Sequence, residues 1–248
     1  MNISSNTLFH FTKDIKTLKS ILEHNFWPSL SIEENNVLDG TMRKLAIPMV
    51  CFCDIPLGNI EKHMNKYGDY AIGLTYKWAK ESGINPVWYV NHSSSIRKNI
   101  RDIFQINPNC LMSEDDSDHG NRMMYLLCYL KKHSTKTRPI DGSKGKITLY
   151  YDEREWRYVP RLFENRERLY LTGEEDADQE RHNQIQEVLK QHPLCFQPSD
   201  INYIIVRKDS EVLDMKHMLE KIKVDYSVKD KEILVTKILS AQRIKNDF

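Results

Sequence analysis

Two stretches of this sequence place ionisable side chains inside segments that otherwise have the composition of β-strands. The first is Leu8-Phe-His-Phe-Thr12, and the second is Tyr151-Asp-Glu-Arg-Glu-Trp-Arg157. Buried strand positions rarely carry such groups unless the groups are paired or take part in chemistry. We therefore expect the two strands to form the two walls of one cleft.

The first stretch offers a histidine and a threonine on one side of a strand. Side chains alternate between the two faces of a strand, so Phe9 and Phe11 face one way while His10 and Thr12 face the other. A neutral imidazole can donate a hydrogen bond to a ribose hydroxyl. A structural histidine held by a hydrogen bond is the alternative interpretation.

The second stretch offers two carboxylates. Glu153 and Glu155 share a face if the segment is extended, and each raises the cost of ionising the other. Arg154 and Arg157 can offset that cost. One carboxylate can hold a ribose hydroxyl and stabilise the positive charge that develops as a glycosidic bond breaks. A turn with solvated charges is the alternative.

A third stretch, His63 to Gly73, contains two tyrosines and two glycines beside a predicted strand. Tyr67 and Tyr70 are candidates to wall a planar ring, because glycine lets a backbone approach closely. Ordinary hairpin chemistry is the alternative. There is no G-x-G-x-x-G or Walker phosphate loop. Together the stretches favour NAD as a substrate, contacted by His10, Thr12, Tyr67, Tyr70 and Arg157.

Composition excludes several classes of protein. The chain has 248 residues and a formal net charge of +1, which gives no global field to attract nucleic acid. Its longest apolar run, Ala46 to Cys53, is far shorter than the roughly 20 residues that cross a bilayer. The N-terminus lacks signal-peptide features, so we expect a cytoplasmic protein without membrane contact. Five scattered cysteines and dispersed histidines predict neither disulfides nor a metal site.

Hydrophobic periodicity predicts a mixed order of helices and strands. The predicted strands are Leu8–Phe11, Pro48–Phe52, Tyr70–Thr75, Val87–Val90, Ile147–Tyr151, Trp156–Val159, Ile201–Val206 and Ile233–Ile238. The predicted helices are Asp14–Glu23, Leu57–Tyr67, Ser94–Ile106, Asn121–Lys132, a segment from Ala177, and Glu211–Lys223. Ser29–Lys44 and the acidic Ser113–His119 read as loops. This order favours one α+β domain over residues 1–248, with an antiparallel or mixed sheet flanked by helices.

Several motifs together resemble a known family. Leu8-Phe-His-Phe-Thr12, Pro48-Met-Val-Cys-Phe-Cys-Asp-Ile-Pro-Leu57, Tyr67-Gly-Asp-Tyr-Ala-Ile-Gly73 and Glu153-Arg-Glu-Trp-Arg157 are similar to the abortive-infection protein family AbiGi. That family is described as an antitoxin of bacterial phage-resistance loci. The resemblance covers nearly the whole chain, and its Cys-Phe-Cys-Asp-Ile-Pro-Leu block is the most specific part. It implies a cognate toxin or antitoxin partner, and it implies no mechanism.

A fainter resemblance is to ADP-ribosyltransferases, especially the DarT-like enzymes that modify nucleic acid. Those enzymes have a first-strand histidine followed by a threonine, an aromatic wall and a late catalytic glutamate. His10, Thr12 and the pair Glu153 and Glu155 match the ends of that pattern, whereas the middle motif matches poorly. This resemblance implies an ADP-ribosyltransferase-like fold, NAD as substrate, and RNA or DNA as the acceptor.

Two hypotheses follow for function. In the first, the chain is an enzyme that passes ADP-ribose from NAD to a macromolecule during phage attack, with His10 and either Glu155 or Glu153 as catalytic residues. In the second, it is a non-catalytic antitoxin that binds a toxin, with Gly173–Gln191 and the helix from Glu211 as interface candidates. A nucleic-acid-binding regulator has less support, because the sequence has no recognition motif for DNA or RNA.

Overall fold

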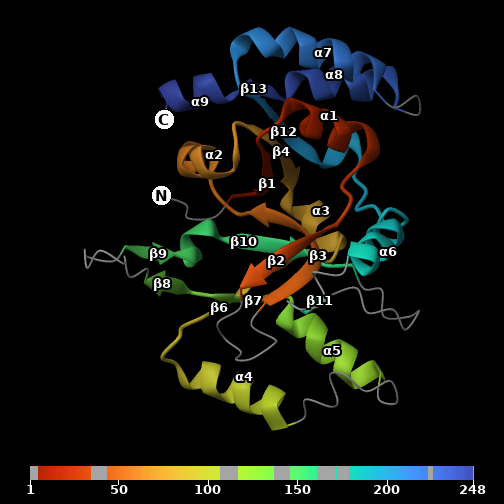
Figure 1. Ribbon diagram of the computed structural model, residues 1–248. Helices are drawn as coiled ribbons and strands as arrows, with labels where there is room; N and C mark the ends of the chain where they lie inside the picture. The colour runs from red at the N-terminus through yellow and green to blue at the C-terminus, as the bar shows by residue number, and fades with distance from the viewer. Residues whose placement is uncertain are drawn as a thin grey trace. The chain divides into compact units, whose positions relative to one another are not determined.

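The structure is a computed structural model that describes residues 5–34, 44–106, 117–136, 146–160, 171–172, 179–222 and 226–247. The chain divides into two compact units, each made of separate stretches of sequence (Figure 1). Unit 1 contains Met1–Trp27, Cys51–Ile84 and Pro193–Phe248, and unit 2 contains Pro28–Val50 and Asn85–His192. Both units combine helices and strands, which confirms the α+β class. A single domain over residues 1–248 stays a prediction.

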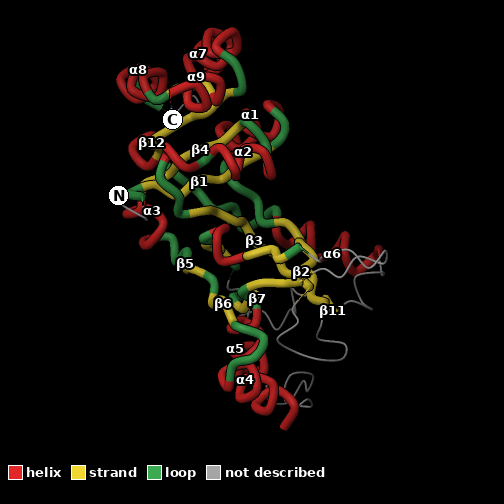
Figure 2. The backbone as a smooth tube through the Cα atoms, turned by 90° about the vertical axis from the view of Figure 1, so that its left-hand side faces the viewer, coloured by secondary structure: helices red, strands yellow, loops and turns green. Residues whose placement is uncertain are grey.

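Unit 1 is built on a mixed sheet. Its strands are β1 (Thr7–Thr12), β4 (Tyr70–Thr75), β12 (Ile201–Val206), β13 (Ile238–Ser240) and the last residues of β3 (Lys44–Cys53). β4 lies between β1 and β12 and is antiparallel to both, while β13 joins β12 in parallel. Figure 2 shows β1, β4 and β12 side by side. The predicted mixed sheet is thereby confirmed for this unit.

Helices cover the strands of unit 1. They are α1 (Ile15–His24), α2 (Glu61–Tyr67), α3 (Tyr76–Glu81), α7 (Val212–Lys221), α8 (Val228–Thr236) and α9 (Ala241–Asp247), with short 3-10 turns at Leu57–Asn59, Pro198–Asp200 and Asp209–Glu211. Asp14 caps the N-terminus of α1, because its carboxylate accepts a hydrogen bond from the Lys16 backbone N–H at 2.9 Å. The helix buries Leu18, Ile21 and Leu22, as its helical spacing predicts.

Among the described residues, unit 2 contains one larger set of paired strands and two separate two-stranded sheets. The strands are β2 (Ser29–Glu34), the first part of β3, β5 (Asn85–Pro86), β6 (Trp88–Val90), β7 (Leu130–Lys132), β8 (Ser134–Lys136), β9 (Ile147–Leu149), β10 (Glu155–Tyr158) and β11 (Leu171–Thr172). β2 and β11 are both antiparallel to β3, β10 is antiparallel to β5, β6 is parallel to β7, and β8 is antiparallel to β9.

The helices of unit 2 are α4 (Ser95–Ile106), α5 (Ser117–Leu127) and α6 (Gln179–Leu189), and a 3-10 turn, η3, spans Tyr150–Glu153. α6 packs on β2 and β3 because Ile185 and Leu189 form an apolar cluster with Ala46 and Leu30. A helix was expected from Ala177, and the described part of that segment is α6. The predicted acidic loop Ser113–His119 lies mostly outside the described residues, and its last three residues begin α5.

Three predicted elements are wrong. Ser29–Lys44 was expected to be a loop, yet its first six residues form β2, because pairing with β3 overrides their polar composition. The helix predicted over Asn121–Lys132 ends at Leu127, and its last three residues form β7. The strand predicted over Ile233–Ile238 is mostly α8, because Ser227 and Asp230 form a capping box that starts a helix there.

Gly68 generates a stability prediction. It ends α2 at φ 121°, and a Cβ placed on it would lie 2.2 Å from the carbonyl oxygen of Thr12. Gly83 also has a positive φ, of 71°, but has open space around it. We expect Gly68→Ala to lower the free energy of unfolding by about 3 kcal/mol and Gly83→Ala by about 1 kcal/mol, measured by urea denaturation. Equal losses would contradict the close approach of Gly68 to β1.

Candidate functional site

A network of ionised side chains is buried in unit 2, with Glu155 at its centre. Glu155 begins β10, and its Oε1 accepts a hydrogen bond from Arg157 Nε at 2.5 Å. Its Oε2 accepts a bond from Lys131 Nζ on β7. The side chain of Arg157 is 0% exposed, and that of Glu155 is 8% exposed. Both carboxylate oxygens of Glu155 are therefore engaged by cations in the protein interior.

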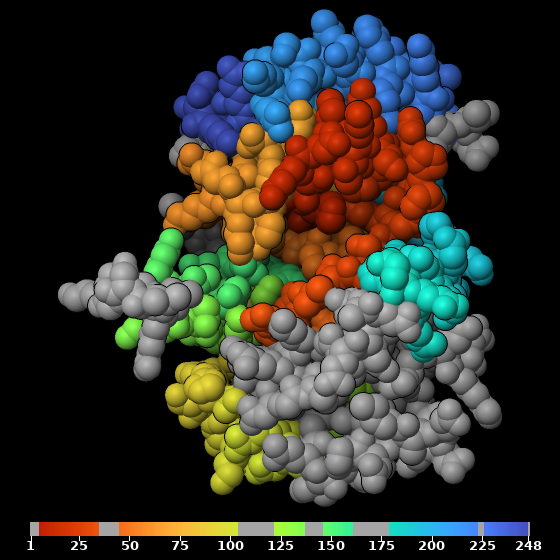
Figure 3. All heavy atoms as spheres, in the orientation of Figure 1, coloured from red at the N-terminus to blue at the C-terminus, as the bar shows by residue number. Residues whose placement is uncertain are grey.

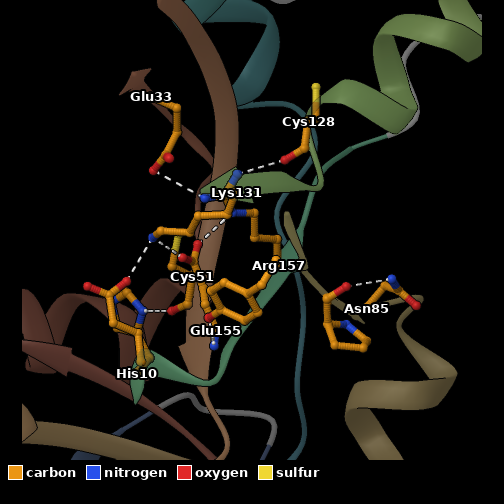
Figure 4. Close-up of polar contacts among 11 residues, drawn as sticks. His10, Glu33, Cys51, Asn85, Cys128, Lys131, Glu155 and Arg157 are labelled. Carbon is orange, nitrogen blue, oxygen red and sulfur yellow. Dashed lines mark hydrogen bonds and ion pairs between the residues drawn. The ribbon is translucent and has the colours of Figure 1, made fainter. Parts of the chain in front are cut away.

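Two further carboxylates complete the network. Glu153 Oε2 lies 2.8 Å from Lys131 Nζ, and Glu33 Oε1 on β2 lies 3.1 Å from Arg157 Nη2. Arg157 Nη1 donates to the carbonyl of Cys128, just beyond α5, at 2.7 Å. Figure 4 shows Glu33, Lys131, Glu155, Arg157 and the Cys128 carbonyl coming together from different elements. Three carboxylates thus share two cations, and the network ties together β2, β7, β10 and the chain that leaves α5.

The surrounding charges decide the ionisation of Glu155. Burial by itself would raise the pKa of this carboxyl, but Arg157 and Lys131 outweigh burial and hold the pKa at about 2. For Lys131 the effect of burial has the opposite sign, because burial alone would lower its pKa. The surrounding carboxylates, Glu155 foremost, outweigh burial and raise the pKa of Lys131 above its ordinary value. Both groups are charged at neutral pH, so the network consists of ion pairs.

The local backbone differs from the extended strand that the sequence predicts for this segment. Tyr150–Glu153 form the 3-10 turn η3, and Arg154 takes a left-handed conformation at φ 46° before β10 begins. Glu153 and Glu155 therefore do not face one way through strand alternation. They converge on Lys131 because the turn at Arg154 redirects the chain, a conformation that a non-glycine residue adopts rarely.

Aromatic rings lie beside the network; we call Tyr89, His133, Tyr150 and Tyr151 the aromatic shelf. The Tyr89 hydroxyl accepts a hydrogen bond from the Glu155 backbone N–H at 2.9 Å. The Tyr151 ring stacks on His133 with centroids 5.6 Å apart and meets the Tyr89 ring edge-on at 5.3 Å. Lys132 Nζ lies 4.9 Å from the centre of the Tyr150 ring. One hydrogen bond thus links the buried network to the shelf.

His10 lies in unit 1, where the predicted alternation along β1 is seen. The Phe9 ring stacks against Phe11, while the His10 ring meets Phe26 and Phe52 edge-on at 5.1 and 5.8 Å. Its Nδ1 lies 2.8 Å from the carbonyl oxygen of Cys51 (Figure 4). Burial lowers the pKa of His10, and this hydrogen bond offsets part of the shift. The ring is therefore neutral at pH 7, with Nδ1–H as donor and Nε2 as acceptor.

Three more of the predicted ligand residues, Thr12, Tyr67 and Tyr70, are also in unit 1, whereas Arg157 belongs to the network of unit 2. Tyr70 is 3% exposed, its hydroxyl donates to Glu211 at 2.8 Å, and the Arg207 guanidinium lies 4.9 Å from its ring centre. Thr12 is the last residue of β1, directly opposite Tyr70. Tyr67 ends α2, with Lys66 Nζ 4.8 Å from its ring centre. Tyr70 thus holds the start of α7 against the sheet.

The structure brings together Glu153, Glu155 and Arg157, which the sequence predicts to be neighbours. His10 belongs to unit 1 and Glu155 to unit 2, so a cleft shared by the two stays a prediction. Sequence reasoning missed Lys131, Glu33 and the aromatic shelf. The only signal for Lys131 was a basic residue in an apolar stretch that had been assigned to a helix. Within the described residues, no cluster of three or more His, Cys, Asp or Glu side chains could hold a metal ion.

The fold and this site define an α+β protein with a buried ion-pair network beside an aromatic shelf. The AbiGi family matches residues 25–207 of this chain. Its description is that of an abortive phage resistance protein that is an antitoxin. The abortive phage resistance protein AbiGi of Lactococcus lactis subsp. cremoris is 31% identical over 234 residues, which cover 84% of this chain and 91% of the relative. The chain belongs to the AbiGi family, as its motifs predict.

Two further findings bear on the predicted fold and on the predicted absence of membrane contact. No solved structure is significantly similar to the chain, so the predicted ADP-ribosyltransferase-like fold has no structural relative that supports it. Among the described residues, no helix has the length and apolar character that a membrane span requires.

Replacing Glu155 tests its position at the centre of the network. Glu155→Gln removes the charge that both Lys131 and Arg157 contact, so we expect a loss of about 3–5 kcal/mol in the free energy of unfolding. Glu33→Gln is the matched control, because Glu33 contacts one cation and its side chain is 22% exposed. It should cost about 1–2 kcal/mol, measured in the same urea denaturation. A smaller loss for Glu155→Gln than for Glu33→Gln would contradict the arrangement.

The lowered pKa of Glu155 predicts a dependence of stability on pH. The folded-state pKa of about 2 lies below the ordinary value of 4.5, so the unfolded chain binds this proton first as the pH falls. The contribution is complete above about pH 4.5 and is lost as the pH falls from 4.5 toward 2. Between pH 5 and pH 3, wild type should lose more unfolding free energy than Glu155→Gln. Equal losses would show that Glu155 has an ordinary pKa.

Proposed function

We propose that this chain is an antitoxin of abortive-infection defence against phage, and that it acts by binding a partner toxin without catalysing a reaction. Its membership of the AbiGi family supports the assignment to phage defence, because the matching family is described as an antitoxin and the Lactococcus relative as a phage resistance protein. The antitoxin description also supports a protein partner. The choice of binding over catalysis is supported by the site.

The state of Glu155 is the observation that carries this choice. A transferase needs a carboxylate that can turn toward a ribose, whereas both oxygens of Glu155 are held by Arg157 and Lys131. Turning Glu155 toward a ribose would break both of its ion pairs at once, leaving Glu153 as a carboxylate partner of Lys131 and the partly exposed Glu33 as that of Arg157, and the loss of these buried contacts costs on the order of a few kcal/mol. A substrate hydroxyl is a neutral group, so a hydrogen bond to it would not compensate for the loss of these ion pairs. Glu155 is therefore best suited to hold β10, β7 and η3 in place.

The environment of His10 agrees with this choice. Its Nδ1–H is directed at the Cys51 carbonyl, and the ring lies against Phe26 and Phe52, so one nitrogen and two ring edges take part in packing. In the neutral ring, Nε2 has no proton to donate to a ribose hydroxyl. These contacts support the alternative interpretation of His10 as a structural histidine held by a hydrogen bond.

The transferase remains the alternative function. It requires His10, Thr12 and Glu155 to meet around NAD, with RNA or DNA as the acceptor, and that arrangement stays a prediction. Its supporting feature is that Glu155 is ionised at neutral pH, as a residue that stabilises an oxocarbenium-like transition state must be.

Two measurements separate the functions. We expect bacteria that express the chain alone to grow normally, and the purified chain to consume no more NAD than a buffer blank. Glu155→Gln and His10→Ala should leave that baseline unchanged. Growth arrest, together with NAD consumption that Glu155→Gln abolishes, would overturn the binding antitoxin and establish the transferase.

A further inference from the structure

Unit 2 displays most of the large apolar side chains that are exposed in the described part of the chain. In unit 2 they are Ile32, Trp88, Ile96, Ile103, Leu126, Ile147, Leu149 and Tyr151, and in unit 1 they are Trp27, Leu213, Val228 and Ile233. Three of them follow one another along β9 and η3: Ile147, Leu149 and Tyr151 are 66%, 38% and 50% exposed. Clustered exposed apolar groups mark interaction surfaces more often than scattered ones.

The geometry of the β8–β9 ribbon gathers these groups on one face. Ile147 and Leu149 are two residues apart on a strand, so both point to the same face. Their antiparallel partners, Lys136 and Ser134, lie on that face as well. Among the described residues this ribbon is a separate two-stranded sheet. Such a ribbon is marginally stable in water unless something packs on its apolar face.

Tyr151 adds an ordered aromatic group next to this face. Its backbone N–H and that of Tyr150 both donate to the His133 carbonyl, at 3.3 and 2.9 Å. Its ring is held between His133 and Tyr89, and Tyr89 is fixed in turn by the Glu155 backbone. Half of the side chain remains exposed. An aromatic side chain that is already ordered loses little entropy on binding, which is typical of residues that dominate interface energies.

The charge around this face indicates the chemistry of the partner. Lys136 lies on this face opposite Ile147, and Lys132 ends the neighbouring strand β7. Among the described residues from Leu130 to Tyr158, Asp152 is the acidic side chain that the buried network does not engage. A second copy packed on the same face would oppose lysine with lysine. An apolar segment that carries carboxylates complements the surface, because it covers Ile147 and Leu149 and pairs with Lys136.

The extent of the family match distinguishes this face from the C-terminal helices. Leu213 and Val228 are also exposed, but they lie beyond residues 25–207, the range that the antitoxin family shares. Ile96 and Ile103 on α4 lie within that range and on one side of a helix. They are exposed to a similar degree, at 62% and 55%, and lie outside the ribbon, so α4 provides the matched control.

We propose that the ribbon face, made of Ser134, Lys136, Ile147, Leu149 and Tyr151, is where this protein binds its partner toxin. The partner contributes an apolar segment with acidic side chains beside it. The proposal rests on the binding function proposed above and names the surface that performs it. Figure 3 shows the green spheres of this part of the chain at the surface, and the yellow spheres of α4 separate from them.

Site-specific photocrosslinking in bacteria that carry the complete defence locus tests the location. The probe is p-benzoylphenylalanine in place of Ile147 in one strain and of Ile96 in the other, in the full-length chain. We expect Ile147 to give one discrete crosslinked protein, identified by mass spectrometry, and Ile96 to give none. No crosslink at Ile147, or the same product from Ile96, would overturn the proposal. A crosslink of the chain to itself would show that a second copy occupies the face.

Affinity measurements with the crosslinked protein, purified separately, then test the energetics. Ile147→Ser combined with Leu149→Ser should weaken binding about 30-fold, while Ile96→Ser combined with Ile103→Ser should leave it unchanged. Lys136→Glu should also weaken binding, and its effect on the affinity should be smaller at high salt. An unchanged affinity of the ribbon variant would refute this surface. The binding antitoxin itself would stand as long as the partner still binds and the chain alone neither halts growth nor consumes NAD.

Discussion

The structure of unit 2 depends on a network in which two buried carboxylates, Glu153 and Glu155, and the partly exposed Glu33 share the cations Lys131 and Arg157. Water would solvate each of these charges well. In the protein interior, the charges are stabilised only by the partners that the fold supplies. Glu155 contacts both cations, so its position fixes Lys131 and Arg157 together. Because these cations reach Glu33 on β2 and the Cys128 carbonyl after α5, segments distant in sequence must adopt one arrangement.

The same interaction shapes the surface. The Glu155 backbone N–H is bound by the Tyr89 hydroxyl, and the Tyr89 ring supports Tyr151 at the surface. Within η3, Glu153 contacts Lys131, while Tyr151 is half exposed. Acidic residues that resemble a catalytic pair in the sequence therefore act, in this account, as the support of a contact surface.

Local patterns in the sequence predict much of unit 1. The alternation of Phe9, His10 and Phe11 predicts correctly that the phenylalanines and the histidine face opposite ways, and helical spacing predicts α1. These features depend on interactions between near neighbours in sequence. The helix at Val228–Thr236 was missed because its apolar residues also fit a strand, and a capping box decided between the two.

The site was only partly predictable, for a physical reason. Glu153, Glu155 and Arg157 lie within five residues, so their proximity follows from the chain. Lys131 and Glu33 come from distant segments, and nothing local distinguishes a buried lysine from the solvated ones around it. The positive φ of Arg154 is likewise set by tertiary contacts, because an arginine rarely adopts it unaided.

The ionisation of Glu155 within the folded protein tests this account most directly. Carbon-13 labelling of glutamate side chains, with the Glu155 signal assigned through Glu155→Gln, allows its carboxyl to be titrated by NMR. We expect this carboxyl to titrate with a pKa of about 2, because Arg157 and Lys131 stabilise its charged form more than burial destabilises it. A carboxyl that takes up its proton near pH 5 or above would be free of those cations, and would contradict the network from which the proposed function is derived.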